Sequence, residues 1–240
     1  MSKRVPAVRA ALAILAILVS LILVCCTTTT ELSFTDEEID FTMGYVMNLI
    51  EERTISELFM RLNEFSEPMV PAEYIVMNQL RHDIPGMDRI LTDWSHQTIT
   101  YILGFYESFR QYCAQIAGSQ VFTDPRALLS SGSSSISLYM RRLHFDAMKQ
   151  VIRQNISSID PTYWQQAIIQ YNAWVNTTNL LSGQNMKTFP AYSDTEEVVD
   201  MVAAHLADLY FKVFSTEEVL IRTTPDPDMD STAARVLGLI

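Results

Sequence analysis

The sequence predicts an all-α protein, a single bundle-like domain of several helices that follows an N-terminal signal and anchor segment. Three observations lead to this class. Long stretches carry apolar residues at the helical steps of three and four. Asp-Pro pairs and glycines stand where helices would begin and end. No stretch shows the strict alternation of apolar and polar residues that marks a half-buried strand.

The chain opens with the pattern of an export signal. Three basic residues precede an apolar run from Ala10 to Val24, which stops at Cys25, Cys26 and a run of threonines. A basic start, an apolar centre and a small-residue stop describe such a signal. Because Leu23 and Val24 precede the cysteines, the segment resembles a bacterial lipobox, whose cysteine is acylated and becomes the mature N-terminus.

Three interpretations of this segment compete. An uncleaved membrane span needs roughly 20 apolar residues, and the run 10–24 is shorter. An ordinary signal has small residues at the −3 and −1 positions, where Leu23 and Cys25 precede Cys26. In a lipobox, Cys25 occupies the position that usually holds Gly, Ala or Ser. The lipoprotein interpretation leads, with Cys26 as the acylated residue and Cys25 as the alternative, since Cys25 would follow the bulky Val24.

The predicted organisation is a signal segment over 1–25, a short polar tether over 26–34 and one helical domain over 35–240. The chain has 17 basic and 28 acidic residues, a net charge of −11, and the three basic signal residues count toward it. Their removal leaves 14 basic against 28 acidic residues, or −14. Such a chain is repelled by nucleic acid and by anionic lipid head groups. We therefore expect no nucleic-acid partner.

Cysteines and histidines suggest neither catalysis nor metal binding. With Cys26 acylated and Cys25 removed with the signal, only Cys113 remains, so no internal disulfide forms and a buried, inert thiol is expected. The four histidines form no HExxH pattern, and the seven glycines form no phosphate-binding loop. We expect no catalytic residue, no metal and no cofactor.

The first predicted helix opens at Thr35, which Glu38 follows in a capping-box pattern. It runs to about Phe65, and Pro68 and Pro71 mark the break after it.

A short helix over 72–80 and a turn over 84–86 follow. The stretch 87–116 then reads as one apolar stripe, with Gly104 inside it and Gly118 able to cap its end. The stripe comprises Met87, Leu91, Trp94, Thr98, Tyr101 or Ile102, Phe105, Phe109, Tyr112 and Ile116.

In the second half, an Asp-Pro pair opens a short helix over 124–130, and a longer helix covers 134–155. Another Asp-Pro pair starts a helix over 160–181, which Gly183 closes. The last long helix is predicted over 193–214. After it we expect a short turn over 216–222, an acidic loop over 225–230 and a terminal helix to Leu237.

The second half also carries motifs of a known family. Residues 122–129 and 135–142 match its F-x-D-A-R-x-I-L and A-A-T-x-Y-F-R segments without a gap. Residues 171–173 match an internal Y-N-A, and 208–238 match its closing segment. In these motifs, clearest from Phe122 to the end of the chain at 240, the chain resembles exported bacterial proteins grouped as domain of unknown function 4197. The resemblance implies a helical fold and export, and no reaction.

The chain departs from that family at three places. Ser135-Ile136-Ser137 replaces Ala-Ala-Thr, His144 replaces a threonine, and Asp228 stands where the family has a basic residue. An anion site built on that last position is therefore not expected here.

A polar ligand site is a candidate near the serine-rich turn at 130–135. Hydroxyls and backbone amides at a helix start, with arginines one or two turns on, can hold a carboxylate or phosphate. The candidate residues are Asp124, Tyr139, Arg141, His144 and Asp208.

The plainer interpretation assigns these residues structural roles. Asp124 then caps a helix, and Arg141 or Arg142 pairs with an acidic residue such as Asp146 or Glu218.

Three i,i+3 or i,i+4 pairs complete the candidates. Glu218 and Arg222 are spaced for a structural ion pair that, if partly buried, fixes how the terminal helix docks. Asp93/His96 and His205/Asp208 each resemble half of a helical metal site. Because the two further carboxylates of such a site cannot be assigned, we expect solvated helix faces instead.

These observations favour a membrane-anchored bacterial lipoprotein that faces the periplasm or the cell surface and acts as a helical binding or interaction module. Its expected partners are membrane lipid, through acylated Cys26, and an envelope protein or small ligand. One alternative is a small-ligand receptor or enzyme that uses the polar residues above; another is a structural envelope protein. No complete catalytic set points to an enzyme.

Overall fold

The computed structural model describes residues 34–64, 69–190 and 195–239. The chain divides into two units, 1–35 and 36–240, and the second contains every helix described below. The signal segment and the candidate acylation sites Cys25 and Cys26 lie outside the described residues. Within the described ranges, no helix has both the length and the sustained apolar character of a membrane-spanning segment.

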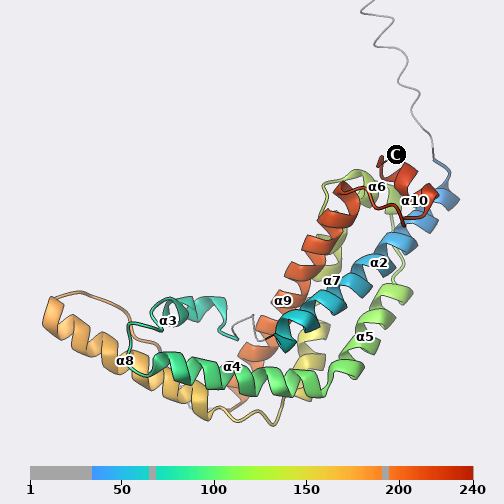
Figure 1. Ribbon diagram of the computed structural model, residues 1–240. Helices are drawn as coiled ribbons and strands as arrows, with labels where there is room; N and C mark the ends of the chain where they lie inside the picture. Colours follow the sequence, from blue (N-terminus) through green and yellow to red (C-terminus); the bar gives the residue numbers. More distant parts are fainter. Residues whose placement is uncertain (1–33, 65–68, 191–194, 240) are drawn as a thin grey trace, which may run out of the picture. The chain divides into compact units, whose positions relative to one another are not determined.

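The described residues form helices and no strand, which confirms the predicted all-α class (Figure 1). In chain order the helices are α2 (Asp36–Asn63), the 3-10 turn η1 (Ala72–Tyr74), α3 (Ile75–Gln79), α4 (Met87–Gly104), α5 (Tyr106–Ser119), α6 (Pro125–Ser130), α7 (Ser135–Asn155), α8 (Thr162–Ser182), α9 (Thr195–Thr223) and α10 (Ser231–Val236).

Helix α9 is the central element, because it packs against both α7 and α2. Its buried residues face both neighbours, and they include the aromatic cluster of Tyr210, Phe211 and Phe214, whose ring centres lie 5.1 to 6.5 Å apart. Helix α2 in turn packs against α5 and α10. An apolar helix surface of this width requires partners on more than one side.

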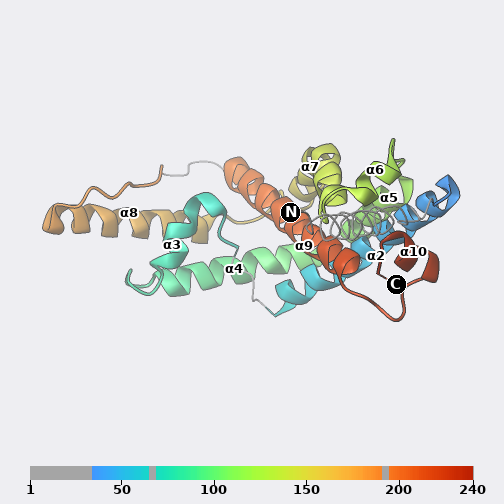
Figure 2. The ribbon, with the colours of Figure 1, turned by 90° about the horizontal axis from the view of Figure 1, so that it is seen from above.

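Helices α4 and α8 form a second packed pair (Figure 2). Trp94 of α4 and Trp164 of α8 are fully buried, with ring centres 5.5 Å apart. The indole nitrogen of Trp94 donates a 2.8 Å hydrogen bond to the carbonyl of Met69, and the ring of Tyr74 meets Trp164 edge-on at 5.0 Å. The aromatic residues of this part of the chain therefore serve the core.

The single stripe predicted over 87–116 is wrong, because the structure divides it into α4 and α5. Phe105 leaves helical geometry at φ −113° and ψ 15°, directly after Gly104. The buried ring of Phe105 meets Phe109 edge-on at 6.1 Å. Helix α4 packs mainly against α8 and less extensively against α2, whereas α5 packs against α2, so the two halves bury their stripes mainly against different partners.

The turn expected over 216–222 is also wrong, since α9 runs unbroken to Thr223. Residues Glu218 and Arg222 in this last part are buried, so the final two turns are held by tertiary contacts. The predicted start at Ser193 lies outside the described residues.

The helix-end signals hold at Asp124 and Gly183 and shift at Asp160. The cap expected at Gly118 is wrong, because α5 continues through Gly118 to Ser119. Asp124 caps α6 by accepting a 2.8 Å hydrogen bond from the amide of Ala127. Gly183 closes α8 at φ 67°, a left-handed conformation that suits glycine. Asp160 accepts from Thr162, yet α8 begins at Thr162, so Pro161 precedes the helix instead of opening it.

Gly44, in the middle of α2, offers a test of helix stability. A Cβ added there meets no atom within 4 Å, so Gly44→Ala is expected to raise the free energy of unfolding by about 0.5–1 kcal/mol through helix propensity and a less flexible unfolded chain. Urea denaturation measures the change.

The matched control is Gly183→Ala, which places a Cβ at φ 67°. It is expected to lower the free energy of unfolding by about 1–2 kcal/mol. Equal effects of the two substitutions would contradict this account of the two glycines.

Candidate functional site

The five residues of the predicted polar site do not meet in one place. Asp124 caps α6. Tyr139 packs its ring against Phe122 at 5.6 Å, and Nε2 of His144 lies 2.9 Å from the side-chain oxygen of Gln120. Only Arg141 and Asp208 contact each other.

Arg141 and Asp208 form an ion pair between α7 and α9. The guanidinium carbon of Arg141 also lies 4.7 Å from the ring centre of Phe145 and 5.9 Å from that of Phe211. Stacking of this kind restricts the side chain and stabilises its charge. Arg141 thus does pair with a carboxylate, although with Asp208 rather than with Asp146 or Glu218.

A pocket of about 390 Å³ opens beside this pair. Arg141, His205, Asp208 and Lys212 line it, together with Glu73 of η1. Among the described residues Lys212 makes no ion pair, and Arg141 uses one of its five N–H donors on Asp208. The pocket therefore holds a guanidinium and an ammonium group with donor capacity left over.

The sequence indicated Arg141 and Asp208 as site residues and paired His205 with Asp208 as half of a metal site, but it assigned no role to Lys212 or Glu73. Lys212 stands one turn after Asp208, and His205 one turn before it, so all three share a face of α9. That spacing was the available signal. The sequence contained no signal for Glu73, because only the tertiary fold brings η1 close to α9.

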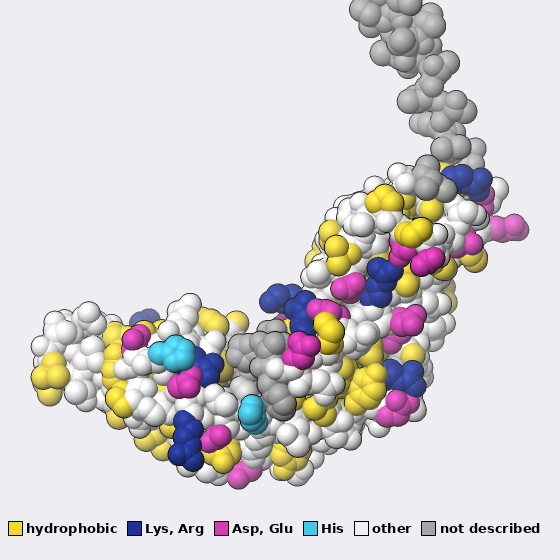
Figure 3. All heavy atoms as spheres, in the orientation of Figure 1, with side chains coloured by type: hydrophobic (Ala, Val, Ile, Leu, Met, Phe, Trp, Pro, Cys, Tyr) yellow, Lys and Arg dark blue, Asp and Glu magenta, His cyan; other side chains and the backbone are white. Residues whose placement is uncertain are grey.

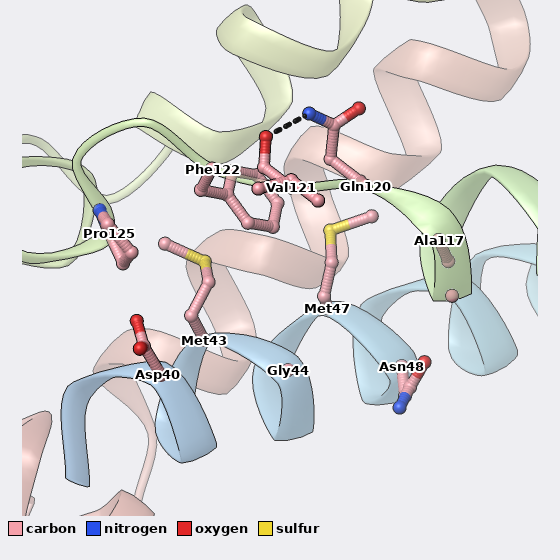
Figure 4. A pocket seen from close by; sticks show the side chains of 11 residues that line it. Asp40, Met43, Gly44, Met47, Asn48, Ala117, Gln120, Val121, Phe122 and Pro125 are labelled. Carbon is pink, nitrogen blue, oxygen red and sulfur yellow. Dashed lines mark hydrogen bonds between the residues drawn. The ribbon is translucent and has the colours of Figure 1, made fainter. Parts of the chain in front are cut away.

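A second pocket, of about 330 Å³, lies between α2 and the end of α5 (Figure 4). Met43 and Met47 extend from α2 toward Phe122 and Val121, while Asp40, Asn48 and Gln120 also line it. Both methionines are buried core residues of α2. Glycines on both helices, Gly44 and Gly118, also line the pocket and were the signal for an opening there.

Within the described part of the chain, Glu218 and Arg222 form a buried, extensively hydrogen-bonded pair, with side chains 0% and 5% exposed, respectively. Their charged atoms lie 2.7 Å apart on successive turns of α9. Glu218 accepts hydrogen bonds from the backbone amides of Ile136 at 3.0 Å and Ser137 at 2.7 Å, and from the Ser137 hydroxyl. These amides belong to the first turn of α7, which lacks intrahelical acceptors.

Arg222 completes the arrangement on the other side of the turn between α6 and α7. It donates to the carbonyls of Leu129, Ser131 and Gly132 at 2.6, 3.2 and 3.1 Å. It also donates to the Ser135 hydroxyl at 2.9 Å. Glu218 therefore caps the start of α7, and Arg222 satisfies carbonyls at the end of α6 and in the turn.

Cys113, His144 and Asp93 are buried or paired with neighbouring side chains. Cys113 is a buried free thiol, and burial raises its pKa, so it stays protonated and unreactive. Burial lowers the pKa of His144. Asp93 lies 3.7 Å from Arg89 in an exposed pair. Among the described residues, no three His, Cys, Asp or Glu side chains come together as a potential metal site.

Comparison with known proteins adds no relative: no family model, no curated protein and no solved structure matches this chain. The resemblance of residues 122–240 to domain of unknown function 4197 accordingly stays a prediction from the sequence motifs.

The buried pair makes a sharp prediction for stability. Glu218→Gln removes the counterion of Arg222 and weakens the cap on α7, so it is expected to lower the free energy of unfolding by about 3–5 kcal/mol. Urea denaturation followed by circular dichroism measures the loss.

Arg89→Gln, which removes an exposed ion pair, is the matched control and is expected to cost less than about 1 kcal/mol. The double variant Glu218→Gln/Arg222→Met should cost less than the sum of its single changes, since each single change leaves one group without its partner. Simple additivity would contradict a coupled pair.

Proposed function

We propose that this protein is a membrane-anchored bacterial lipoprotein that acts as a helical binding module of the cell envelope. Two features of the sequence support the anchor: the lipobox-like end of the signal segment at Cys26, and the resemblance of the second half to an exported family. The acylated Cys26 would hold the helical domain at the membrane, facing the periplasm or the cell surface, through a tether of a few residues.

One observation carries the binding function, the pocket beside Arg141. In a chain with a net charge of −11, this pocket gathers Arg141 and Lys212 with spare donors. Its volume of about 390 Å³ falls in the range of small-molecule sites. A guanidinium and an ammonium in one pocket bind carboxylate or phosphate oxygens through charge-assisted hydrogen bonds. The ligand we infer is therefore a small molecule with a carboxylate or phosphate group.

Of the two carboxylates that line this pocket, Asp208 fits binding better than catalysis. Asp208 holds Arg141 in place, so this carboxylate already has a partner. The enzyme alternative retains one supporting observation, that His205 and Asp208 line the same pocket one turn apart.

The anchor predicts the mass of the mature N-terminus. Mass spectrometry of protein extracted from its own membrane is expected to find a chain that begins at Cys26 and carries acyl groups. Cys26→Ser should leave the signal attached and the residue unacylated. An unmodified Cys26, or a chain that still begins at Met1, contradicts the lipoprotein proposal.

The pocket predicts anion binding that depends on Lys212. Inorganic phosphate and succinate, at ionic strength matched with chloride, are expected to raise the melting temperature of the protein. Lys212→Gln should weaken the apparent affinity about tenfold, the equivalent of one lost charged hydrogen bond.

Arg89→Gln also removes one positive charge but lies outside the pocket, so it should leave the affinity unchanged. The same affinity in Lys212→Gln and in the original chain would contradict the assignment of this pocket.

A further inference from the structure

Residues 161–193 form a segment without a single Asp or Glu, in a chain that has 28 of them. Lys187 is its only charged residue. Helix α8, which makes up most of the segment, carries no charged side chain at all. The end of α8 visible in Figure 3 shows white and yellow side chains, whereas acidic and basic groups alternate over α2 and α9.

Two adjacent leucines at the C-terminal end of α8 are exposed to water. Leu180 is 85% and Leu181 is 81% exposed, and polar uncharged residues follow them in the loop. Moving apolar side chains exposed to this degree out of water lowers the free energy of the system.

The leucines sit on an ordered support. The Asn179 side chain donates to the carbonyl of Met186 and accepts from its amide, both at 2.9 Å. Two helical turns earlier, Asn172 makes the same paired contact with Phe189 at 2.7 and 2.9 Å. These paired hydrogen bonds hold the returning loop along α8, so the helix end presents the leucines in a fixed position.

Backbone groups at this end are partly satisfied. The Ser182 hydroxyl donates to the carbonyl of Thr178 at 2.6 Å, and the Gly183 amide donates to that of Asn179 at 3.0 Å. This matters because each unsatisfied carbonyl opposes transfer into an apolar medium.

We propose that the end of α8 contacts a lipid bilayer and inserts Leu180 and Leu181 into its interfacial region. A contact with a second copy of the chain is disfavoured, because two leucine side chains expose far less area than the approximately 800 Å² per partner of a stable interface. A bilayer, unlike a protein partner, accepts the leucines without a surface of complementary shape. The absence of carboxylates from residues 161–193 lessens the repulsion by anionic head groups that the rest of this acidic chain experiences. The contact is independent of acylation and of the anion pocket.

The test places a tryptophan at the tip. The full chain carrying Leu181→Trp is reconstituted in phosphatidylcholine vesicles with brominated acyl chains, which quench nearby tryptophans. Fluorescence is compared with that of the unsubstituted chain, whose native tryptophans supply a constant background. We expect the added emission to shift to the blue and to be quenched at least twofold.

Val121→Trp is the matched control, because Val121 is 84% exposed but lies in the loop after α5. Its added emission should stay unshifted and unquenched. Equal quenching at both positions, or none at position 181, overturns the proposal. Since position 181 is exposed, the melting temperature of either variant should match that of the original chain.

Two further measurements separate lipid from other occupants. Replacing 30% of the lipid with phosphatidylglycerol should preserve the quenching of Leu181→Trp, whereas its loss overturns the charge argument. Single-molecule photobleaching at low protein-to-lipid ratio should find one copy per diffusing spot. Pairs that disappear in Leu180→Asn/Leu181→Asn would overturn lipid insertion in favour of a dimer.

Discussion

The structure depends on the buried ion pair of Glu218 and Arg222 at the end of α9. Glu218 supplies acceptors for the first-turn amides of α7, and Arg222 supplies donors for carbonyls of α6 and of the turn between the two helices. One pair of side chains therefore terminates one helix and starts another. Without it, these polar backbone groups would be buried without partners, which costs more than an exposed helix end.

The pair also determines how α7 lies along α9. Apolar contacts between two helices tolerate several rotations, whereas hydrogen bonds to particular amides allow one. Once the start of α7 is fixed at Glu218, Arg141 comes to face Asp208. Lys212, one turn after Asp208 on α9, lines the same inferred anion pocket. The candidate site is thus a consequence of the same docking that the buried pair specifies.

Charge is distributed unevenly over this acidic protein. Spare donors gather in the pocket between α7 and α9, while α8 carries no charge and ends in two exposed leucines. The proposed anion pocket and the proposed bilayer contact therefore depend on different interactions. An anion binds where cations and donors converge, and a bilayer is approached by the part of the surface that lacks carboxylates.

The sequence by itself determined the helical class, most helix bounds, the caps at Asp124 and Gly183, and the proximity of Glu218 to Arg222. Each of these features depends on residues within about one helical turn of one another. Such residues share a helix face or a hydrogen bond whatever the rest of the fold is. Tertiary structure alone decided the break at Phe105, the continuation of α9 and the distant partners of Tyr139, Arg141 and His144, which are Phe122, Asp208 and Gln120. These follow from which faces meet, and partners as distant in sequence as Ser137 and Glu218 cannot be inferred from local spacing.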